Sequence, residues 1–550
     1  MKTITKFVFL SFCCSLLLGA CAPQAQSVST TDAPQQEIAT ATSLPTKDIY
    51  SLWVAPYLPQ DLQDQIMLPK NVVLADTQDE ADIWLDIGGD QQVSQWVYAL
   101  AAPFPTVPDS ITSQELVQIW KGEGSADSPL QSLLVDGKTK ATFEKVWGVP
   151  SSSTVILTNE ENLLTAAWSK TGAWAIIPFE TLETRWKVIA LDDISPLDDD
   201  FNADQYALSV AFSLLGKTED LQVLNTRITA AGNALVPSTN RDENKITTVA
   251  MTGVTALVRG TAYMMEKYGM TYPALDIGDI LRNADITHIS NEIPFTETCP
   301  NPFYNSENDA NLVFCSKPEY INLLDSIGTD VVELTGDHFR DWGADAMLYT
   351  LDLYDQRGWK YYGGGRNLEE GQQPALFEHN GNKIAFLGCN AKPEGYATAD
   401  VDYPGAVHCD MEVMAEQIKA VKAQGYIPIV TFQHIEYYDY AASPYLVKDF
   451  HTVAEAGAAI VSGSQAHQPQ AFEFYKGAFL HYGLGNLFFD QYNEGSAQRQ
   501  AFIDRYIIYD GRVISTDLIT IMFVDMARPR LMHADERQDL LETIFTASGW

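Results

Sequence analysis

Three histidines and an aspartate stand where predicted strands give way to polar loops. The segment VVELTGDHFRDWG begins as an apolar strand and turns polar at Asp337 and His338. His434 and His467 follow two later apolar segments in the same way, and Glu292 lies upstream. Imidazole and carboxylate groups are ordinary ligands for divalent Zn, Mn or Fe ions, and they also act as general acids and bases. The set predicts a metal site or an acid–base site, although a single histidine at a strand end is more often a hydrogen-bonded surface residue.

The elements around these residues would have to bring them together. Between about residues 244 and 530 the sequence repeats a helix, an apolar strand and a polar tip. The predicted helices are 316–328, 410–425 and 443–457, and the strands that follow them are 329–335, 426–433 and 458–462. Apolar strands that alternate with amphipathic helices indicate a largely parallel, buried sheet. Because sites in such sheets form at the carboxyl ends of the strands, we expect an α/β fold with the four tip residues at a common sheet edge.

The N-terminus has the features of an export signal. Lys2 and Lys6 precede an apolar stretch too short for a comfortable membrane span. The segment Leu18-Gly19-Ala20-Cys21 resembles the lipobox of bacterial lipoproteins, which implies cleavage after residue 20 and acylation of Cys21. Residues 21–47, rich in Ala, Thr, Ser, Gln and Pro, predict a flexible tether. The expected location is therefore the outer face of a bacterial membrane or the cell surface, held by lipid; an ordinary signal peptide or an uncleaved anchor is the alternative.

Charge and cysteine content narrow the range of partners. The formal net charge is −37, so the chain repels nucleic acid, and it would also repel a polyanionic polymer unless cations intervene. Cys299, Cys315, Cys389 and Cys409 remain after the signal, and in an oxidising compartment they favour disulfides with three possible connectivities. Pairing in chain order would close two loops, and zinc binding is less favoured because no CxxC pair is present.

Residues 48–235 predict a separate, smaller α/β domain. Predicted strands at 96–104, 172–182 and 185–193 accompany a helix that begins after Thr112 and ends at Gly122. The segments VYALAAPFPTVPDSITSQELVQIWKG and AWAIIPFETLETRWKVIALDDISPL resemble type 2 periplasmic substrate-binding proteins of the phosphate-binding kind. That resemblance implies a small anionic ligand, whereas a plain α/β domain without a ligand is the competing interpretation.

Residues 246–492 resemble the CapA family of poly-γ-glutamate capsule biosynthesis proteins, whose domain is similar to calcineurin-like metallophosphatases. The matching segments are HISNEIPFT, VVELTGDHFRDWG, YYGGGRNLEE, KIAFLGCN, IVTFQHIEYY, AGAAIVSGSQAHQPQ and LHYGLGNLFFDQ. The resemblance implies a layered α/β/β/α sandwich over residues 244–530, with 531–550 as a C-terminal helix or tail. It assigns Glu292, Asp337, His434 and His467 to a metal, and His338 and Asp341 to catalysis, with His338 protonating a leaving group.

Three positions depart from the family pattern. Val254 stands where the family has a metal-binding Asp, and Ser464 and Gln465 replace a pair of histidines. Valine cannot bind a metal, and Ser and Gln are poor substitutes for imidazole. The remaining residues could hold a single divalent ion, while a two-metal site is not favoured.

Three functions fit these observations. The first is a surface lipoprotein that helps assemble or retain an extracellular capsule polymer, either poly-γ-glutamate or polysaccharide. The second is a mononuclear metal-dependent hydrolase that acts on phosphoester or amide bonds. The third is a solute-binding or sensing protein that uses residues 48–235.

Overall fold

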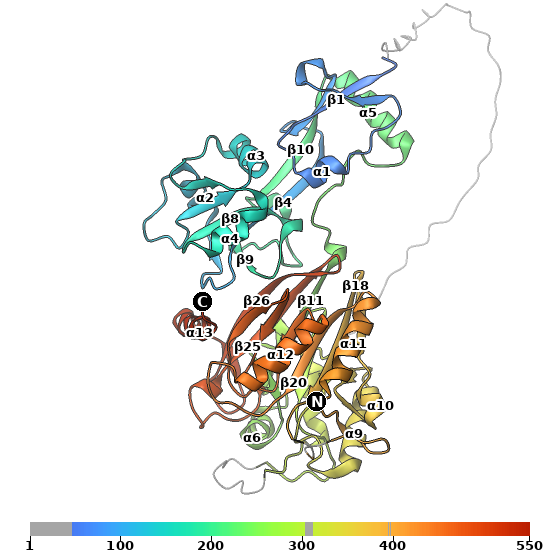
Figure 1. Ribbon diagram of the computed structural model, residues 1–550, viewed down its shortest axis with the longest axis vertical. Coiled ribbons are helices and arrows are strands. Elements are labelled where there is room, and N and C mark those ends of the chain that lie inside the picture. Colours follow the sequence, from blue (N-terminus) through green and yellow to red (C-terminus); the bar gives the residue numbers. More distant parts are fainter. Residues whose placement is uncertain (1–46, 303–311, 394, 396–397) are drawn as a thin grey trace, which may run out of the picture. The chain divides into compact units, whose positions relative to one another are not determined.

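The computed structural model describes residues 47–302, 312–393, 395 and 398–550 (Figure 1). The expected signal peptide, Cys21 and nearly all of the expected tether lie outside these ranges. Residues 48–550 form one unit of mutual contacts. Within the described residues, no helix combines the length and the apolar character that crossing a membrane requires.

The first part of this unit, residues 48–235, is built on one mixed sheet. Its strand order is β2-β1-β3-β10-β4-β8-β6-β7, and β9 joins β4 and β5 at the side. The strands are β1 (Tyr50–Val54), β2 (Val72–Leu74), β3 (Ile83–Ile87), β4 (Gln92–Pro103), β5 (Ser110–Ile111), β6 (Ser132–Val135), β7 (Val155–Leu157), β8 (Ala173–Pro178), β9 (Trp186–Leu191) and β10 (Ser209–Gly216). The helices are α1 (Gln60–Asp64), α2 (Ser113–Lys121), α3 (Gly137–Trp147), α4 (Leu163–Trp168) and α5 (Thr218–Ala231). As the sequence predicted, Thr112 caps α2 by accepting the Glu115 N–H at 3.1 Å, and Gly122 ends it in the left-handed conformation.

The second part contains two sheets rather than the single sheet that the strand pattern suggested. One has the order β15-β14-β13-β11-β25-β26-β27, with β12 paired to β13 and β24 paired to β12, and the other has the order β17-β18-β20-β21-β23-β22. The first sheet contains β11 (Ile246–Thr252), β12 (Val254–Thr255), β13 (Ile286–Asn291), β14 (Val331–Glu333), β15 (Lys360–Tyr362), β24 (Asn486–Phe488), β25 (Gln500–Tyr509), β26 (Arg512–Phe523) and β27 (Pro529–Leu531). The second contains β17 (Ala375–His379), β18 (Asn382–Asn390), β20 (Ile427–Gln433), β21 (Ile460–Ser462), β22 (Phe472–Tyr475) and β23 (Ala478–His481), and a small pair joins β16 (Gly364–Gly365) to β19 (Gly405–Ala406).

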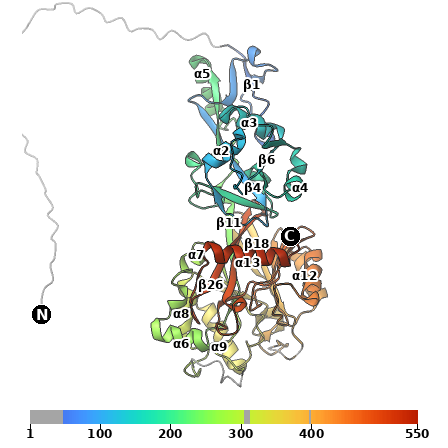
Figure 2. The same cartoon turned by 90° about the vertical axis from the view of Figure 1, so that its left-hand side faces the viewer.

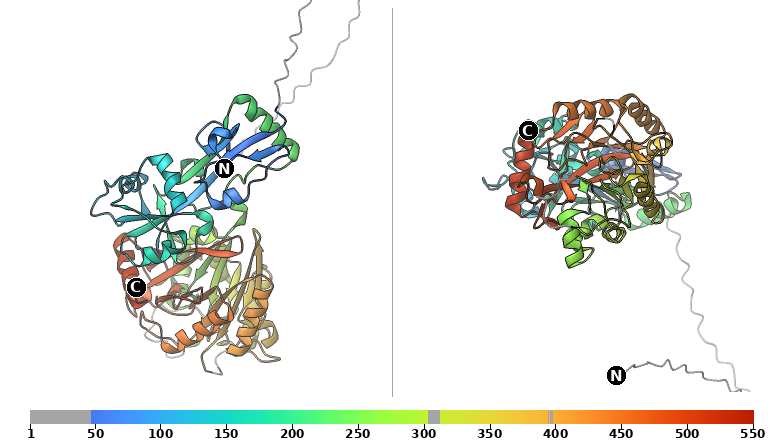
Figure 3. Two further views of the ribbon diagram at one scale, coloured as in Figure 1. Left: turned by 45° about the horizontal axis from the view of Figure 1, so that its top comes forward. Right: turned by 90° about the horizontal axis from the view of Figure 1, so that it is seen from below.

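Helices cover the outer faces of both sheets and complete four layers, as the family resemblance implied. The helices are α6 (Arg259–Tyr268), α7 (Gly278–Arg282), α8 (Ile321–Ser326), α9 (Gly343–Asp355), α10 (Leu368–Gly371), α11 (Met411–Ala423), α12 (Pro444–Ala456) and α13 (Ala534–Ala547). Helices α6 to α9 share a core with β13 and β14, and α11 and α12 share one with β18, β20 and β21. Figure 2 and the right-hand view of Figure 3 show these two helix layers on opposite sides of the strands. A third core, to which α13 contributes, fills the space between the sheets.

The helix ends follow the sequence signals where a capping residue is present. Asp410 caps α11 and Ser443 caps α12, with Pro444 at the first helical position and Gly457 beyond the end. The predicted helix 316–328 is shorter than expected: α8 covers only Ile321–Ser326, because a 3₁₀ turn at Pro318–Tyr320 precedes it. The structure also contains both disulfides that pairing in chain order suggested, Cys299–Cys315 and Cys389–Cys409.

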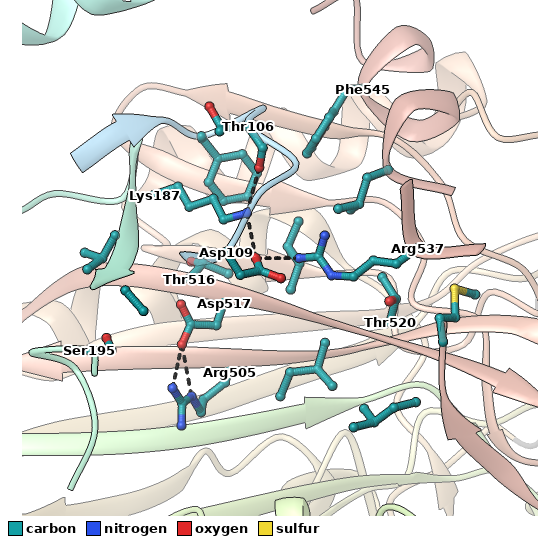
Figure 4. Close-up of a pocket in the computed structure, with 18 residues that line it drawn as sticks. Thr106, Asp109, Lys187, Ser195, Arg505, Thr516, Asp517, Thr520, Arg537 and Phe545 are labelled. Carbon is teal, nitrogen blue, oxygen red and sulfur yellow. Dashed lines mark hydrogen bonds and ion pairs between the residues drawn. The ribbon is translucent and has the colours of Figure 1, made fainter. Parts of the chain in front are cut away.

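The two parts pack directly on each other. Phe104 at the end of β4 is 2% exposed and lies in the core between the sheets of the second part. Next to it is a cavity of about 400 Å³, where Asp109 pairs with Lys187 at 2.7 Å and with Arg537 at 2.8 Å (Figure 4). Since Lys187 and Asp109 come from the first part and Arg537 from α13, these ion pairs join the two parts.

Candidate metal centre

The candidate site lies where the carboxyl ends of parallel strands from both sheets meet. Glu292 follows β13, and Asp337 and His338 follow β14, which is parallel to β13. Lys392, Glu436 and His467 follow β18, β20 and β21 in the other sheet, which are also parallel to one another. The expectation of a strand-end site therefore holds, but two sheets supply its residues instead of one.

Glu292, Asp337 and His338 form the centre of this site. One potential ligand atom from each lies within 4.8 Å of the others. Glu292 is 1% exposed, and within the described residues its Oε1 atom and the Oδ1 atom of Asp337 are buried without a hydrogen-bond partner. Buried carboxylate oxygens without partners are costly, and a cation bound by both residues would offset that cost.

Asp341 orients the ring of His338. The Nδ1 atom of His338 lies 2.7 Å from Asp341 Oδ2, which also accepts the backbone N–H of Phe314 at 2.7 Å. The Phe314 ring packs against the imidazole with 4.7 Å between ring centres. Because Nδ1 is held by Asp341, the Nε2 atom is the one left to act as a ligand.

The acid–base state of the centre reflects its crowding with acids. Burial, followed by the charge of Asp337, raises the pKa of Glu292 to about 8. Burial lowers the pKa of His338, but the hydrogen bond to Asp341 and the charges of Glu292 and Asp337 outweigh it and raise that pKa to about 9. Burial also opposes ionisation of Asp337, yet Lys392 and His338 hold its pKa below the usual range. The carboxylates of this centre therefore outnumber the positively charged side chains that face them.

Two further residues, Lys392 and Glu436, belong to the site although the sequence interpretation did not include them. The Lys392 ammonium donates to Asp337 Oδ2 at 2.5 Å and to Glu436 Oε1 at 2.9 Å. The exposed fractions of the Lys392 and Asp337 side chains are 10% and 6%. The available signal was position: Lys392 follows the carboxyl end of an apolar strand, as the predicted site residues do.

The two other predicted histidines lie at different distances from the centre. His467 bonds through Nδ1 to Asn486 Oδ1 at 2.9 Å, and its Nε2 atom lies 3.9 Å from Glu436 Oε1, so Glu436 links it to Lys392. Burial lowers the pKa of His467, which favours the neutral ring. His434 turns its Nε2 atom to Asp449 on α12 at 3.0 Å, and the three-residue centre does not include it.

Comparison with known proteins identifies the second part of the chain. Residues 248–491 match the family described as "Bacterial capsule synthesis protein PGA_cap". These residues belong to that family. The chain is 26% identical over 262 residues to the capsule biosynthesis protein CapA of Bacillus anthracis, covering 47% of this chain and 63% of the relative. It is 26% identical over 185 residues to the PGA biosynthesis protein CapA of Bacillus subtilis (strain 168), covering 33% and 48%. The chain therefore spans less than two thirds of each of these relatives.

Solved structures show distant likenesses to both parts. An ABC-type phosphate transport receptor from Vibrio cholerae is 14% identical with a TM-score of 0.27, covering 33% of this chain and 96% of that one. A 5'-nucleotidase precursor from Thermus thermophilus is 10% identical with a TM-score of 0.30, covering 55% and 59%.

The positions where the CapA-type domain departs from the family pattern are filled by packing and hydrogen bonds. Val254 is fully buried in an apolar cluster. Ser464 donates to the buried Glu333, and Gln465 Nε2 lies 2.5 Å from Ser290 Oγ. Val254 offers no ligand atom, and the Ser464 hydroxyl and the Gln465 amide nitrogen are engaged within the protein, whereas Gln465 Oε1 is buried without a partner among the described residues. That the site holds a single ion stays a prediction.

The remaining residues fit a single divalent ion. Glu292 Oε1, Asp337 Oδ1 and His338 Nε2 would provide three protein ligands, which is the number found in metal sites that keep a position open for water or substrate. Carboxylate and imidazole together suit Zn, Mn or Fe. In this arrangement His338 serves as a ligand, whereas the resemblance implied a proton donor. The two roles exclude each other, because a ring nitrogen that binds a metal carries no proton.

Proposed function

We propose that this chain is an exported, lipid-anchored protein whose CapA-type domain takes part in assembling or retaining an extracellular capsule polymer. The observation that carries this proposal is the family match over residues 248–491, together with the capsule and PGA biosynthesis names of its relatives. The lipobox-like segment that ends at Cys21 supports the surface location. The net charge of −37 favours a neutral polymer or a polyanion that is bridged by cations.

The direct test is genetic. In the bacterium that encodes this chain, deletion of its gene should lower the amount of cell-bound capsule polymer, and the full-length gene should restore it. A Cys21→Ser version should move the protein from the membrane fraction to the soluble fraction, because it lacks the acylated thiol. Unchanged capsule in the deletion strain would contradict the capsule role, and a membrane-bound Cys21→Ser protein would contradict the anchor.

The geometry also supports a second function, a mononuclear metal-dependent hydrolase of phosphoester or amide bonds. Its basis is one buried oxygen on each of Glu292 and Asp337, both without a partner in the part of the chain that the structure describes, together with the nearby His338. A bound divalent ion would supply a polarised water as nucleophile. Asp341 would fix the ring of His338, and Phe314 would shield that ring from solvent.

Metal analysis tests this second function. The purified chain should retain about one Mn²⁺ or Zn²⁺ per molecule, and His338→Ala should lose it together with hydrolysis of a chromogenic phosphodiester. His451→Ala is the matched control, because His451 pairs with Glu473 and stacks on Tyr475 away from the centre. A folded wild-type chain that binds no transition metal would rule out this function.

A further inference from the structure

Lys392 occupies the junction between the two halves of the site. It follows β18 of one sheet and contacts Asp337, which follows β14 of the other sheet. It also contacts Glu436, which follows β20. Its side chain is 10% exposed, so the ammonium is largely withdrawn from water between two carboxylates. Burial of this kind is tolerated only where the charge is paired closely.

The two oxygens of Asp337 face different surroundings. Oδ2 accepts a hydrogen bond from the Lys392 ammonium at 2.5 Å, whereas Oδ1 is buried, and neither Oδ1 nor Glu292 Oε1 has a hydrogen-bond partner among the described residues. Glu292 is 1% exposed, so its unpartnered oxygen lies within the protein and not at the surface. Asp337 therefore offers one oxygen to the lysine and the other to a ligand that Glu292 and His338 can share.

The balance of charge explains why a fixed cation would be needed. Four carboxylates surround the centre: Glu292, Asp337, Asp341 and Glu436. One divalent ion with a neutral His338 ligand would leave the group two charges negative, and the Lys392 ammonium reduces this to one. Asp337 would then carry one cation on each of its oxygens, the lysine ammonium on Oδ2 and the divalent ion on Oδ1.

We infer that Lys392 is the built-in second cation of this site. Its ammonium fills the position between Asp337 and Glu436 that a second divalent ion would otherwise take, so the site binds one ion. This inference rests on the proposed metal centre, and it assigns Lys392 a role in setting the number of ions. Lysine holds this position permanently, whereas a metal ion exchanges with solution.

The test is the number of Mn²⁺ ions bound by the purified full-length chain, measured by equilibrium dialysis with elemental analysis. The wild type should bind about one ion, and Lys392→Ser should bind about two, because it frees Asp337 Oδ2 and Glu436 for a second ion. Paramagnetic resonance should then show coupling between neighbouring Mn²⁺ ions in this variant only. Lys392→Arg keeps the charge and should still bind about one.

Lys317 provides the matched control, since it also donates to a carboxylate and an amide oxygen, those of Glu266 and Asn301, but away from the site. Lys317→Ser should leave the stoichiometry unchanged. If Lys392→Ser is too unstable for dialysis without metal, the rise of its thermal midpoint on adding Mn²⁺ should exceed that of the wild type. An equal or smaller rise would overturn the inference.

The number of bound ions distinguishes a failure of this inference from a failure of the proposed metal centre. One ion in both wild type and Lys392→Ser overturns the role of Lys392 and leaves the metal centre in place. Two ions in the wild type also overturn it. No ion in the wild type, whatever Lys392→Ser binds, removes the metal centre and with it the inference that rests on it. No ion in either protein overturns both.

Discussion

At the scale of single residues, the main feature of the site is that its carboxylates outnumber its positively charged side chains. Lys392 donates to one oxygen of Asp337, while the other oxygen of Asp337 and one oxygen of the buried Glu292 have no hydrogen-bond partner among the residues that the structure describes. Asp341 is occupied by the ring of His338. This arrangement destabilises the folded protein when no cation is bound, because a buried polar group without a hydrogen-bond partner costs on the order of 1–3 kcal/mol. The binding of a cation would offset that cost.

Glu180, in the first part of the chain, allows a test of how burial of one carboxyl group changes its pKa and the stability of the protein. Burial raises its pKa to about 7 from the ordinary 4.5, although it accepts a hydrogen bond from Asn240. The folded chain therefore keeps this proton at a pH where the unfolded chain releases it, so stability falls as the pH rises from about 4.5 to about 7. We expect Glu180→Gln to stabilise the protein by about 2 kcal/mol at pH 8 and by almost nothing at about pH 4.

Urea denaturation at both pH values measures the difference. Glu161→Gln is the control, because Glu161 is exposed and its neutralisation should leave stability unchanged at either pH. A Glu180→Gln variant that gains no stability at the higher pH would show that Glu180 is not buried as the structure has it.

The sequence allowed prediction of the residues that follow strands but not of their partners. Asp337 and His338 could be placed because they follow an apolar segment, and parallel strands bring such ends together, whereas Glu292 was placed by the family resemblance. Lys392 also follows an apolar strand. The sequence, however, contains no pattern that distinguishes a buried, paired lysine in a loop from a lysine that is exposed to solvent. His434 was assigned to the metal, but its ring meets Asp449, and no local pattern reveals a contact between a loop and a helix face.

At the scale of elements, the approach of two strand ends depends on a glycine. Gly336 lies between β14 and Asp337, and a Cβ atom added there would lie 2.7 Å from Glu292 Cα and 2.8 Å from its carbonyl oxygen. Contacts of that length are far inside van der Waals separation, so a side chain at 336 would force the two strand ends apart. The close pairing of Glu292 with Asp337 therefore requires glycine at this position.

We expect Gly336→Ala to weaken Mn²⁺ binding by at least about tenfold, although it removes no ligand, because it displaces Asp337 and His338 from Glu292. Isothermal titration calorimetry measures the affinity. Gly137→Ala is the control: a Cβ there meets nothing within 4 Å, and its binding should match the wild type. Equal affinity in Gly336→Ala would mean that the ion binds elsewhere.

Element prediction succeeded where side chains cap or end a helix. Asp410, Ser443 and Thr112 mark starts that the structure reproduces, since each side chain accepts a backbone N–H of the first turn. The shorter α8 was not predictable in the same way, because Pro318 suits the first turn of a 3₁₀ helix as well as that of an α-helix.

At the scale of the whole molecule, the chain places a small mixed α/β domain on a four-layered CapA-type domain. The family resemblance implied the four layers, whereas the alternation of helices and strands suggested a single sheet, and neither predicted how the two parts meet. Phe104 lies within 6.4 Å, between ring centres, of five rings of the second domain: Phe472, Phe474, Phe479, Phe545 and Trp550. More than 360 residues separate Phe104 from this cluster in the sequence, and no local pattern encodes such a contact.

We expect Phe104→Ala to lower the free energy of unfolding by about 3–5 kcal/mol, because it removes a buried ring and leaves a cavity at the domain junction. Urea denaturation followed by tryptophan fluorescence gives the value. Val149→Ala, at a side chain that is 78% exposed, should change it by less than about 0.5 kcal/mol. A similarly small loss for Phe104→Ala would indicate that the two domains do not pack as described.

The most direct measurement is anomalous X-ray diffraction at the manganese edge from crystals of the protein grown with Mn²⁺. The account predicts one strong peak within bonding distance of Glu292 Oε1, Asp337 Oδ1 and His338 Nε2, with the Lys392 ammonium still between Asp337 and Glu436. No peak at these three residues, or a second peak in the place of the ammonium, would contradict it.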